Sequence, residues 1–430
     1  MNIAIIGSGP SAFYTIQSFL RENIDIKIDV FEKHPAPYGL VRYGVAPDHQ
    51  KTKNITRLFS KYLSEDKVKF YGNINIGIDL EVSFLSAIYD AVIISSGSSN
   101  DKNLDIVGSN LKGVYGSGEF VGWYNGNPLH EKLNPDFNTK NAVIIGNGNV
   151  ALDCARVLAK TNKEFYGSDI TEYSLNKLQK SKIENIYVTG RRTPKDSKFT
   201  IAELRELGQL DNFLPYVNFE KESLEGILRD SGLETKVKKN IEVLLNFKGL
   251  NNKEKNKVIF NFLYTPYKIN GDNKVDSITF KKNKIVANNL EITDETETIK
   301  TNLIISAIGY KVNPIRGIEL DPTKSFFAND NGHIKGNIYT NGWAAGASVG
   351  VIGSNKIGAS ILAKKILHET KSKKIKSNEK LLSYLENNNI RYINKTGWSK
   401  IEDIENKQAS ENFLRKKMVN IEEIFQVLSN

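Results

Sequence analysis

Two glycine-rich segments of the chain have the residue types and spacing with which proteins hold the pyrophosphate of a dinucleotide. They are Gly7-x-Gly9-x-x-Ala12 and Gly146-x-Gly148-x-x-Ala151. In both, an apolar run typical of a strand comes before the glycines and a helical pattern follows them. Glycines at such a turn let backbone N–H groups at the positive end of the helix approach phosphate oxygens. Both segments are therefore candidate dinucleotide-binding loops.

The residues that end the next strand differ between the two candidates. The strand predicted over 26–31 is followed by Glu32, a carboxylate placed to accept hydrogen bonds from a ribose diol. The strand predicted over 186–189 is followed by Arg191 and Arg192, whose guanidinium groups suit a 2′-phosphate that an acid would repel. The first loop predicts an adenosine cofactor and the second favours NADP over NAD. The alternatives are a solvated strand end for Glu32 and a solubilising pair for the arginines.

The elements that would position these loops are two strand–helix–strand openings. Expected strands cover 3–6 and 142–145, and the helices after them cover 11–22 and 151–160. Short alternating strands with turn signals between 258 and 299 predict an antiparallel layer attached to the second opening. Helices are expected over 355–370 and within 377–430. A length of 430 residues suggests two or three domains.

Composition excludes several classes of site and partner. A single cysteine, Cys154, rules out an internal disulfide, a Cys-x-x-Cys redox pair and a thiolate zinc site, and five scattered histidines leave no metal site to expect. The net charge of +10 is consistent with binding to an acidic partner. The alternative is that it reflects a lysine-rich composition that has no functional role. The basic runs lack interleaved aromatic residues, so we expect no nucleic acid as a partner.

The apolar runs have strand length, which predicts no membrane span. The first expected strand starts almost at Met1 and leaves no room for a cleavable leader, so we expect a cytoplasmic protein. A chain with two dinucleotide loops usually holds one nucleotide tightly and exchanges the other. That combination predicts a flavin together with a nicotinamide.

A longer set of motifs resembles one family. The segment 38–49, Tyr-Gly-Leu-Val-Arg-Tyr-Gly-Val-Ala-Pro-Asp-His, resembles the adrenodoxin reductase type of ferredoxin-NADP reductase. Further matching segments are 70–73, 120–126, 146–153, 190–192, 199–206, 306–310, 342–343 and 397–400. The resemblance covers essentially the whole chain.

The resemblance implies an α/β fold with two Rossmann-like, three-layer nucleotide-binding domains of the glutathione reductase kind. The NADP domain, 105–334, would be inserted into an FAD domain made of 1–104 and 335–430. The FAD domain would end in a helical tail.

The resemblance also implies roles for individual residues around FAD and NADP(H). The FAD group is Gly7, Gly9, Ser11, Glu32, Leu40, Ile76, Trp343, Gly350, Val351 and Ile352. The NADP group is Asn147, Gly148, Asn149, Val150, Arg191, Arg192, Glu203 and, again, Gly350. A core role is the alternative for an aromatic residue such as Trp343.

Two residues are candidates for direct participation in the chemistry. His49 is positioned to relay a proton or donate a hydrogen bond near the flavin, and Asp153 is expected opposite it. The alternatives are a packing or surface role for His49, and for Asp153 a favourable interaction with the helix dipole.

The resemblance implies a 2Fe-2S ferredoxin as electron acceptor. Such ferredoxins are usually acidic, and Arg205 with the basic residues of 236–239 would supply a complementary face. The chain departs from the family in one place, because 345–350 reads Ala-Gly-Ala-Ser-Val-Gly where the family often has Lys-Arg-Gly-Pro-Thr-Gly. Loss of two basic side chains there puts the identity of the partner in doubt.

Three alternative functions remain open from the sequence. They are an NADPH diaphorase, the electron-input subunit of a larger complex, and a nucleotide-binding sensor that catalyses no reaction. The sequence predicts neither the oligomeric state nor the direction of electron flow.

Overall fold

The computed structural model describes residues 1–430 apart from 23, 251–254, 288, 347–351, 371–376 and 430. The chain divides into two compact units. Unit 1 consists of Met1–Asn100, Asn125–Glu131 and Gly309–Asn430, and unit 2 of Asp101–Tyr124 and Lys132–Ile308. The division by function near 104 and 334 stays a prediction. In the described part of the chain, no helix combines the length and the apolar character that a bilayer crossing requires.

A six-stranded sheet forms the centre of unit 1, with the strand order β16-β17-β4-β1-β2-β3. Its strands are β1 Asn2–Ile6, β2 Lys27–Glu32, β3 Val68–Gly72, β4 Ala91–Ile94, β16 His333–Lys335 and β17 Ile338–Thr340. All neighbouring strands are parallel except β16 and β17. Because both faces of a parallel sheet are covered, its strands are apolar on both sides. β1 has this pattern, with Ile3 and Ile5 in one core and Ala4 and Ile6 in the other.

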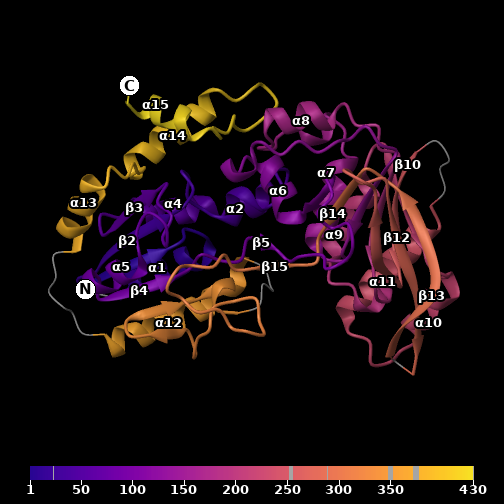
Figure 1. Ribbon diagram of the computed structural model, residues 1–430, viewed down its shortest axis with the longest axis horizontal. Coiled ribbons are helices and arrows are strands. Elements are labelled where there is room, and N and C mark those ends of the chain that lie inside the picture. Colours follow the sequence, from indigo (N-terminus) through magenta and orange to yellow (C-terminus); the bar gives the residue numbers. More distant parts are fainter. Residues whose placement is uncertain (23, 251–254, 288, 347–351, 371–376, 430) are drawn as a thin grey trace. The chain divides into compact units, whose positions relative to one another are not determined.

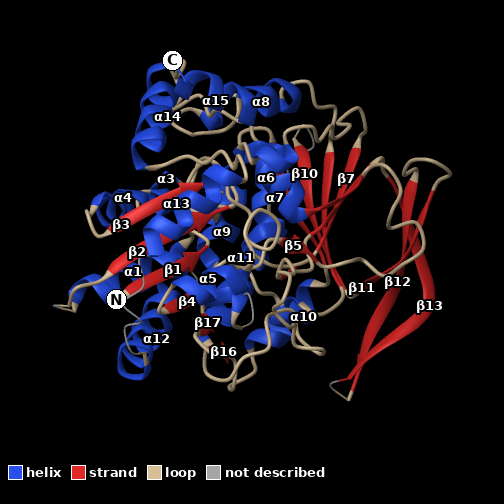
Figure 2. Ribbon diagram, turned by 60° about the vertical axis from the view of Figure 1, so that its left-hand side comes forward, coloured by secondary structure: helices blue, strands red, loops and turns tan. Residues whose placement is uncertain are grey.

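Helices cover both faces of this sheet, as Figures 1 and 2 show. The core that contains Ile3 and Ile5 also contains side chains of α1 Pro10–Arg21, α4 Thr56–Ser64, α12 Asn355–Glu369, α14 Lys395–Lys407 and α15 Ile421–Ser429. The opposite core contains side chains of α5 Val82–Ile88 and α13 Ser377–Asn387. Two one-turn helices, α2 Leu40–Tyr43 and α3 Gln50–Lys53, lie in the connection from β2 to α4. Unit 1 is thus a three-layer α/β unit.

Unit 2 contains a second six-stranded sheet, all parallel, with the order β6-β14-β7-β8-β10-β9. Its strands are β6 Val114–Gly116, β7 Asn141–Ile145, β8 Asn185–Gly190, β9 Phe213–Asn218, β10 Asn256–Phe262 and β14 Leu303–Ser306. Its helices are α6 Ser117–Asn125, α7 Asn149–Ala159, α8 Glu172–Leu178, α9 Ile201–Glu206, α10 Lys221–Leu228 and α11 Thr235–Lys248. Two short strands, β5 Asn100–Asp101 and β15 Tyr310–Lys311, lie where the chain passes between the units.

A three-stranded antiparallel sheet forms the third layer of unit 2 (Figure 2). Its strands are β11 Tyr264–Asn270, β12 Ser277–Val286 and β13 Asn289–Lys300. Ile278 and Phe280 from this layer share a core with Val143 and Ile145 of β7. The antiparallel layer expected over 258–299 starts later than predicted, because residues 256–262 pair with β8 and β9 as an interior strand of the parallel sheet.

Candidate functional site

The first glycine loop joins β1 to α1 in unit 1. Gly7 has φ +102°, and a Cβ added to it would lie 2.5 Å from the carbonyl oxygen of Ser95, so only glycine fits there. Gly9 is the N-cap of α1, and an added Cβ would meet no atom within 4 Å. The loop is closed on the side of β4 and open at the start of the helix. Open space beside a helix N-terminus suits a phosphate.

Glu32 at the end of β2 is buried and fixes the shape of this loop. Its Oε2 accepts hydrogen bonds from Ser8 N at 3.0 Å and Ser8 Oγ at 2.7 Å, and its Oε1 accepts one from His34 N at 3.1 Å. A carboxylate offers about four acceptor positions, so about one remains for a ribose hydroxyl. Glu32 therefore organises the glycine loop as well as offering an acceptor. Sequence analysis missed the part played by Ser8.

The segment before α2 forms a second wall of the loop. Tyr38 N donates to the carbonyl oxygen of Ser8 at 3.0 Å. Gly39 has φ +49°, and a Cβ on it would stand 3.0 Å from the Cα of Gly9. The backbones at Gly39 and Gly9 therefore approach closely, and Leu40 follows directly as the half-buried first residue of α2.

Residues 341–343 reach the same helix terminus from β17. Gly342 has φ +60°, and an added Cβ would lie 2.6 Å from the Cβ of Ser11. Asn341 accepts a hydrogen bond from Ser95 Oγ at 2.6 Å and donates one to Thr15 Oγ1 at 2.6 Å. Sequence analysis missed Asn341, although it stands immediately before the Gly-Trp pair.

Two buried polar atoms near this loop have no hydrogen-bond partner among the described residues. They are Ser96 Oγ, next to the backbone that faces Gly7, and the indole Nε1 of Trp343. Buried polar groups are normally satisfied, so each invites a ligand atom. Together with the open space at Gly9, these atoms fit a nucleotide cofactor in unit 1.

The remaining residues predicted around FAD lie at different depths. Ile76 is buried in the core on the α5 side, and Ile352 is half-buried against the core that contains α12. Gly350 and Val351 lie outside the described residues. His49 is half-buried at the N-cap position of α3. Its role in catalysis stays a prediction, as do the roles of the other site residues.

The second glycine loop, in unit 2, repeats the geometry of the first. A Cβ on Gly146, with φ +141°, would lie 2.3 Å from the carbonyl oxygen of Ala307, whereas a Cβ on Gly148 would meet nothing within 4 Å. Gly148 is the N-cap of α7. The half-buried Val150 lies in the first turn of that helix. The loop is again closed toward a neighbouring strand and open at the helix N-terminus.

Side chains around this loop hold its shape and leave polar atoms for a ligand. Asn149 Oδ1 accepts a hydrogen bond from Thr200 N at 2.7 Å, which ties α7 to the start of α9, where Glu203 lies. Among the buried oxygen atoms that lack a hydrogen-bond partner in the described part of the chain are Asn147 Oδ1, Thr189 Oγ1 and Ser306 Oγ. These three residues follow or end parallel strands, and ligands of such sheets bind at that edge.

Arg191 and Arg192 follow β8 at the same edge, and both are exposed. Their backbones are fixed, since Arg191 O accepts from Asn283 Nδ2 at 2.7 Å and Arg192 O accepts from Leu263 N at 3.1 Å. The Arg192 guanidinium lies 3.6 Å from Asp196, a weak surface pair. Anchored backbones with exposed guanidinium groups are suited to bind a phosphate from solution.

Asp153 in α7 has a structural partner that sequence analysis did not name. Its Oδ1 lies 2.6 Å from Nη2 of Arg156, which is 2% exposed and also lies 3.2 Å from Glu206 Oε2. The pair spans one helical turn, so its (i, i+3) spacing was a readable signal. Next to it, burial raises the pKa of the Cys154 thiol well above its usual range, with Asp153 and Asp101 adding to the effect. The thiol is therefore kept protonated and unreactive.

Arg156→Met is expected to lower the free energy of unfolding by about 2 kcal/mol, because two carboxylates lose a charge-assisted partner and Asp153 is only 14% exposed. Chemical denaturation measures this. Asp153→Ala removes the same pair and should cost a similar amount. A fall in kcat of Asp153→Ala that Arg156→Met does not share would indicate that Asp153 acts in catalysis as well.

Several known proteins are similar to this chain in sequence. The model of the family described as pyridine nucleotide-disulphide oxidoreductase matches residues 1–187. The NADPH-ferredoxin reductase FprA of Mycobacterium tuberculosis is 38% identical over 82% of this chain and 80% of its own length. The chain belongs to the family of NADPH-ferredoxin and NADPH:adrenodoxin reductases. The Arabidopsis thaliana mitochondrial NADPH:adrenodoxin oxidoreductase is 32% identical over 100% of this chain and 96% of its own.

A solved structure of this reductase family has the same fold as this chain. The structure of Mycobacterium tuberculosis FprA in complex with NADPH matches with a TM-score of 0.95 and 32% identity, and covers 100% of this chain and 99% of that one. The predicted family resemblance, fold class and oxidoreductase class are confirmed.

Proposed function

We propose that this protein is an NADPH-dependent flavoprotein that passes electrons to a ferredoxin-type protein. Unit 1 holds FAD at the first glycine loop, and unit 2 receives NADPH at the second. One relative is named an NADPH-ferredoxin reductase and another an NADPH:adrenodoxin oxidoreductase. The bound cofactors supply the chemistry, in which hydride passes from NADPH to FAD and electrons then leave singly.

The observation that carries the proposal is the difference between the two strand ends. Glu32 is buried and accepts hydrogen bonds from the loop beside it, whereas Arg191 and Arg192 are exposed on anchored backbone. A buried acid suits a nucleotide that is held permanently and carries a free ribose diol. Exposed guanidinium groups suit a 2′-phosphorylated nucleotide that exchanges with solution.

The chain's own residues contribute positioning rather than a nucleophile. In unit 1, the backbone at Gly9 and the acceptor at Glu32 hold FAD, and Ser96 and Trp343 offer polar atoms to it. In unit 2, residues 147–150 hold the pyrophosphate of NADPH, while Arg191 and Arg192 hold its 2′-phosphate. His49 and Asp153 remain the candidates for moving or holding a proton.

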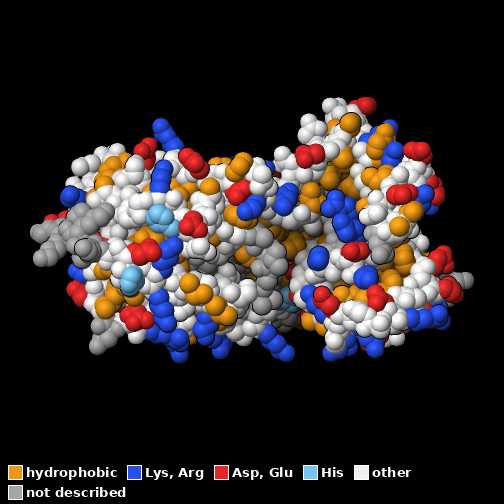
Figure 3. Space-filling view, turned by 90° about the horizontal axis from the view of Figure 1, so that it is seen from below, with side chains coloured by type: hydrophobic (Ala, Val, Ile, Leu, Met, Phe, Trp, Pro, Cys, Tyr) orange, Lys and Arg blue, Asp and Glu red, His pale blue; other side chains and the backbone are white. Residues whose placement is uncertain are grey.

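The partner is proposed to be an acidic 2Fe-2S ferredoxin that binds a basic area of unit 2. Arg205 of α9 and Lys236, Lys238 and Lys239 of α11 are exposed. Asn240 of α11 donates to Phe199 O at 3.0 Å, which anchors this helix to the segment before α9. On the face drawn in Figure 3, basic, acidic and apolar side chains are mixed. The cytoplasmic location stays a prediction.

Anaerobic reduction of the purified protein tests the function. Wild type is mixed with NADPH or NADH while flavin absorbance is followed, and a 2Fe-2S ferredoxin is then added. Bleaching by NADPH followed by ferredoxin reduction supports the proposal. Bleaching without ferredoxin reduction favours the diaphorase or the subunit of a larger complex, and a flavin that neither nicotinamide reduces favours the sensor.

Charge reversal in α11 tests the partner surface. The variant Lys236→Glu/Lys239→Glu is expected to raise the KM for ferredoxin about tenfold at low salt, because like charges then face the acidic partner, with less effect at high salt. Lys180→Glu, an exposed lysine of unit 2 outside this area, is the matched control. Equal effects of both variants, or a change in NADPH bleaching, would contradict a docking role for α11.

A further inference from the structure

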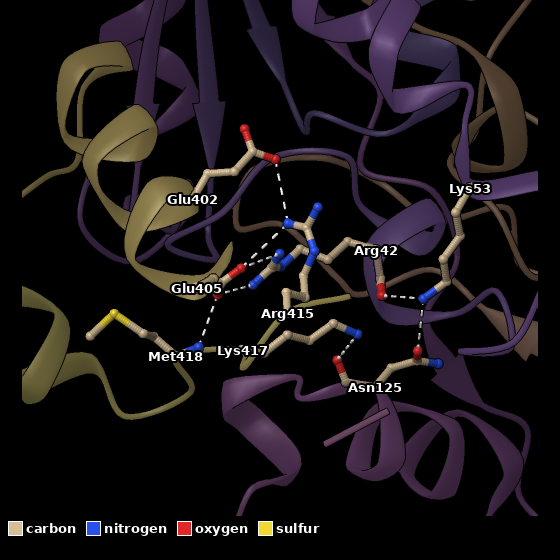
Figure 4. A network of polar contacts seen from close by, with 8 residues as sticks. All are labelled: Arg42, Lys53, Asn125, Glu402, Glu405, Arg415, Lys417 and Met418. Carbon is tan, nitrogen blue, oxygen red and sulfur yellow. Dashed lines mark hydrogen bonds and ion pairs between the residues drawn. The ribbon is translucent and has the colours of Figure 1, made fainter. Parts of the chain in front are cut away.

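A buried ion pair joins the C-terminal region of unit 1 to the segment after β2. Arg42 Nη2 lies 2.5 Å from Glu405 Oε1, and Nη1 lies 3.1 Å from Oε2, so the contact is bidentate (Figure 4). Arg42 is 5% exposed and Glu405 is 0% exposed. Arg42 belongs to α2 and Glu405 to α14, and 363 positions of sequence separate them. Neither Arg42 nor Glu405 is among the site residues predicted from the sequence.

Stability alone does not account for such a pair. Burying two charges costs solvation free energy, and apolar residues of similar size often hold two elements together equally well. What a bidentate guanidinium–carboxylate contact adds is a fixed orientation. Trp398 of α14 constrains the same group, since its ring centroid lies 5.2 Å from the Arg42 guanidinium carbon. The direction in which α2 points is therefore set by α14.

From Arg42 a short series of backbone contacts leads to the first glycine loop. Arg42 N donates to Gly39 O at 3.1 Å, and Tyr38 N donates to Ser8 O at 3.0 Å. A Cβ on Gly39 would approach the Cα of Gly9 to 3.0 Å. A rotation or shift of α2 would therefore move the backbone that borders the open space at Gly9.

The network around the pair extends to Arg415 and Met418, which follow α14 and give Glu405 further contacts. Glu405 Oε1 also accepts from Met418 N at 2.9 Å, and Arg415, which is 25% exposed, approaches Glu405 Oε2 to 3.5 Å. Burial opposes the charge on Arg42, but Glu405 and Tyr43 outweigh it and raise the pKa of Arg42. The arginine therefore stays charged.

The same network holds Asn125, the last residue of α6, with which the unit 1 stretch Asn125–Glu131 begins. Lys53 Nζ donates to Arg42 O at 3.5 Å and to Asn125 Oδ1 at 3.1 Å, and Lys417 Nζ donates to Asn125 O at 3.0 Å. Three parts of the chain that are distant in sequence, 42–53, 125 and 402–418, thus meet around α2 (Figure 4).

We propose that Arg42 and Glu405 are positioning residues for the cofactor: through them, helix α14 holds the wall of the glycine loop in the shape that retains FAD. The inference rests on the proposed function, because it takes FAD to be the ligand of unit 1. It assigns to the C-terminal region a role in cofactor affinity, in addition to packing on the sheet.

The test compares two Glu→Gln variants of matched bidentate pairs. Glu405→Gln weakens the buried pair. Glu422→Gln weakens the exposed pair of the same unit, in which Arg391 lies 2.6 and 3.1 Å from the two oxygens of Glu422. Among the described contacts, none joins this exposed pair to residues 38–43. FAD is titrated into each apoprotein while flavin fluorescence is followed, and the melting temperature of each apoprotein is measured separately. Glu405→Gln is expected to raise the Kd for FAD about tenfold, and Glu422→Gln to leave it unchanged.

A double variant separates positioning from stability. In Arg42→Met/Glu405→Leu the buried charges are gone, so the apoprotein should melt at or above the temperature of wild type while the Kd for FAD stays raised. Arg42→Lys, which keeps the charge and loses the fork, should lie between wild type and Glu405→Gln. Should Glu405→Gln not fold, the double variant decides alone. Wild-type FAD affinity in the double variant, or an equal rise in Glu422→Gln, overturns the inference. Failure of wild type to bind FAD would instead overturn the proposed function.

Discussion

Replacing Arg191 and Arg192 together with alanine is expected to raise the KM for NADPH about 100-fold and to leave the KM for NADH nearly unchanged. Each guanidinium contributes charge-assisted hydrogen bonds to a 2′-phosphate, each worth about 1.5–3 kcal/mol. Both side chains are exposed, and the ion pair of Arg192 with Asp196 is a weak surface contact, so little stability depends on the two arginines. Steady-state dye reduction with either nicotinamide measures the preference.

Arg229→Ala is the control for the loss of a positive charge. Arg229 is exposed in the same unit, at the C-cap of α10, and lies outside the strand edge that carries Arg191 and Arg192. It should change neither KM. If the double variant retains its preference for NADPH, the 2′-phosphate is bound elsewhere and the interpretation of the β8 strand end is wrong. If both nicotinamides lose affinity equally, the arginines support the loop rather than select the nucleotide.

The parts of the fold that sequence predicted are those in which local pattern and tertiary structure agree. Strands β1 and β7 and helices α1 and α7 lie within two residues of their expected bounds, because a buried apolar run, a glycine turn and a helical pattern occur together. Strand β10 was misassigned. Its residues alternate much as a half-buried strand does, and only pairing with β8 and β9 shows that it lies inside the parallel sheet.

The candidate site was predictable where one short segment contains both the turn and its ligand-facing groups. Contacts between distant segments were not, since sequence spacing carries no information about which segments meet. Asn341 bonds to Ser95 and Thr15, and Arg42 pairs with Glu405 at a separation of 363 residues. Charged residues are usually exposed, so nothing in the sequence pattern points to the burial of Arg42, which is 5% exposed.

The two glycines of the first loop are expected to respond oppositely to alanine. Gly7→Ala should lower the free energy of unfolding by at least about 2 kcal/mol, because φ is +102° and the new Cβ would stand 2.5 Å from Ser95 O. Gly9→Ala should leave the apoprotein within about 0.5 kcal/mol of wild type, since Gly9 has φ −84° and open space around it. Urea denaturation of the two apoproteins measures the difference.

In the protein that folds, Gly9→Ala should weaken FAD binding more than Gly7→Ala does. The Cβ in Gly9→Ala would occupy the space through which the pyrophosphate reaches the backbone at the N-terminus of α1, so FAD affinity should fall at least about 100-fold. Gly148→Ala, the corresponding change in unit 2, should leave FAD bound and raise the KM for NADPH instead, because an added Cβ there also meets nothing within 4 Å. Should Gly9→Ala bind FAD as wild type does, the open space at α1 is not where the pyrophosphate lies. The glycine pattern would then serve only the turn, with Gly7 as the residue that requires it.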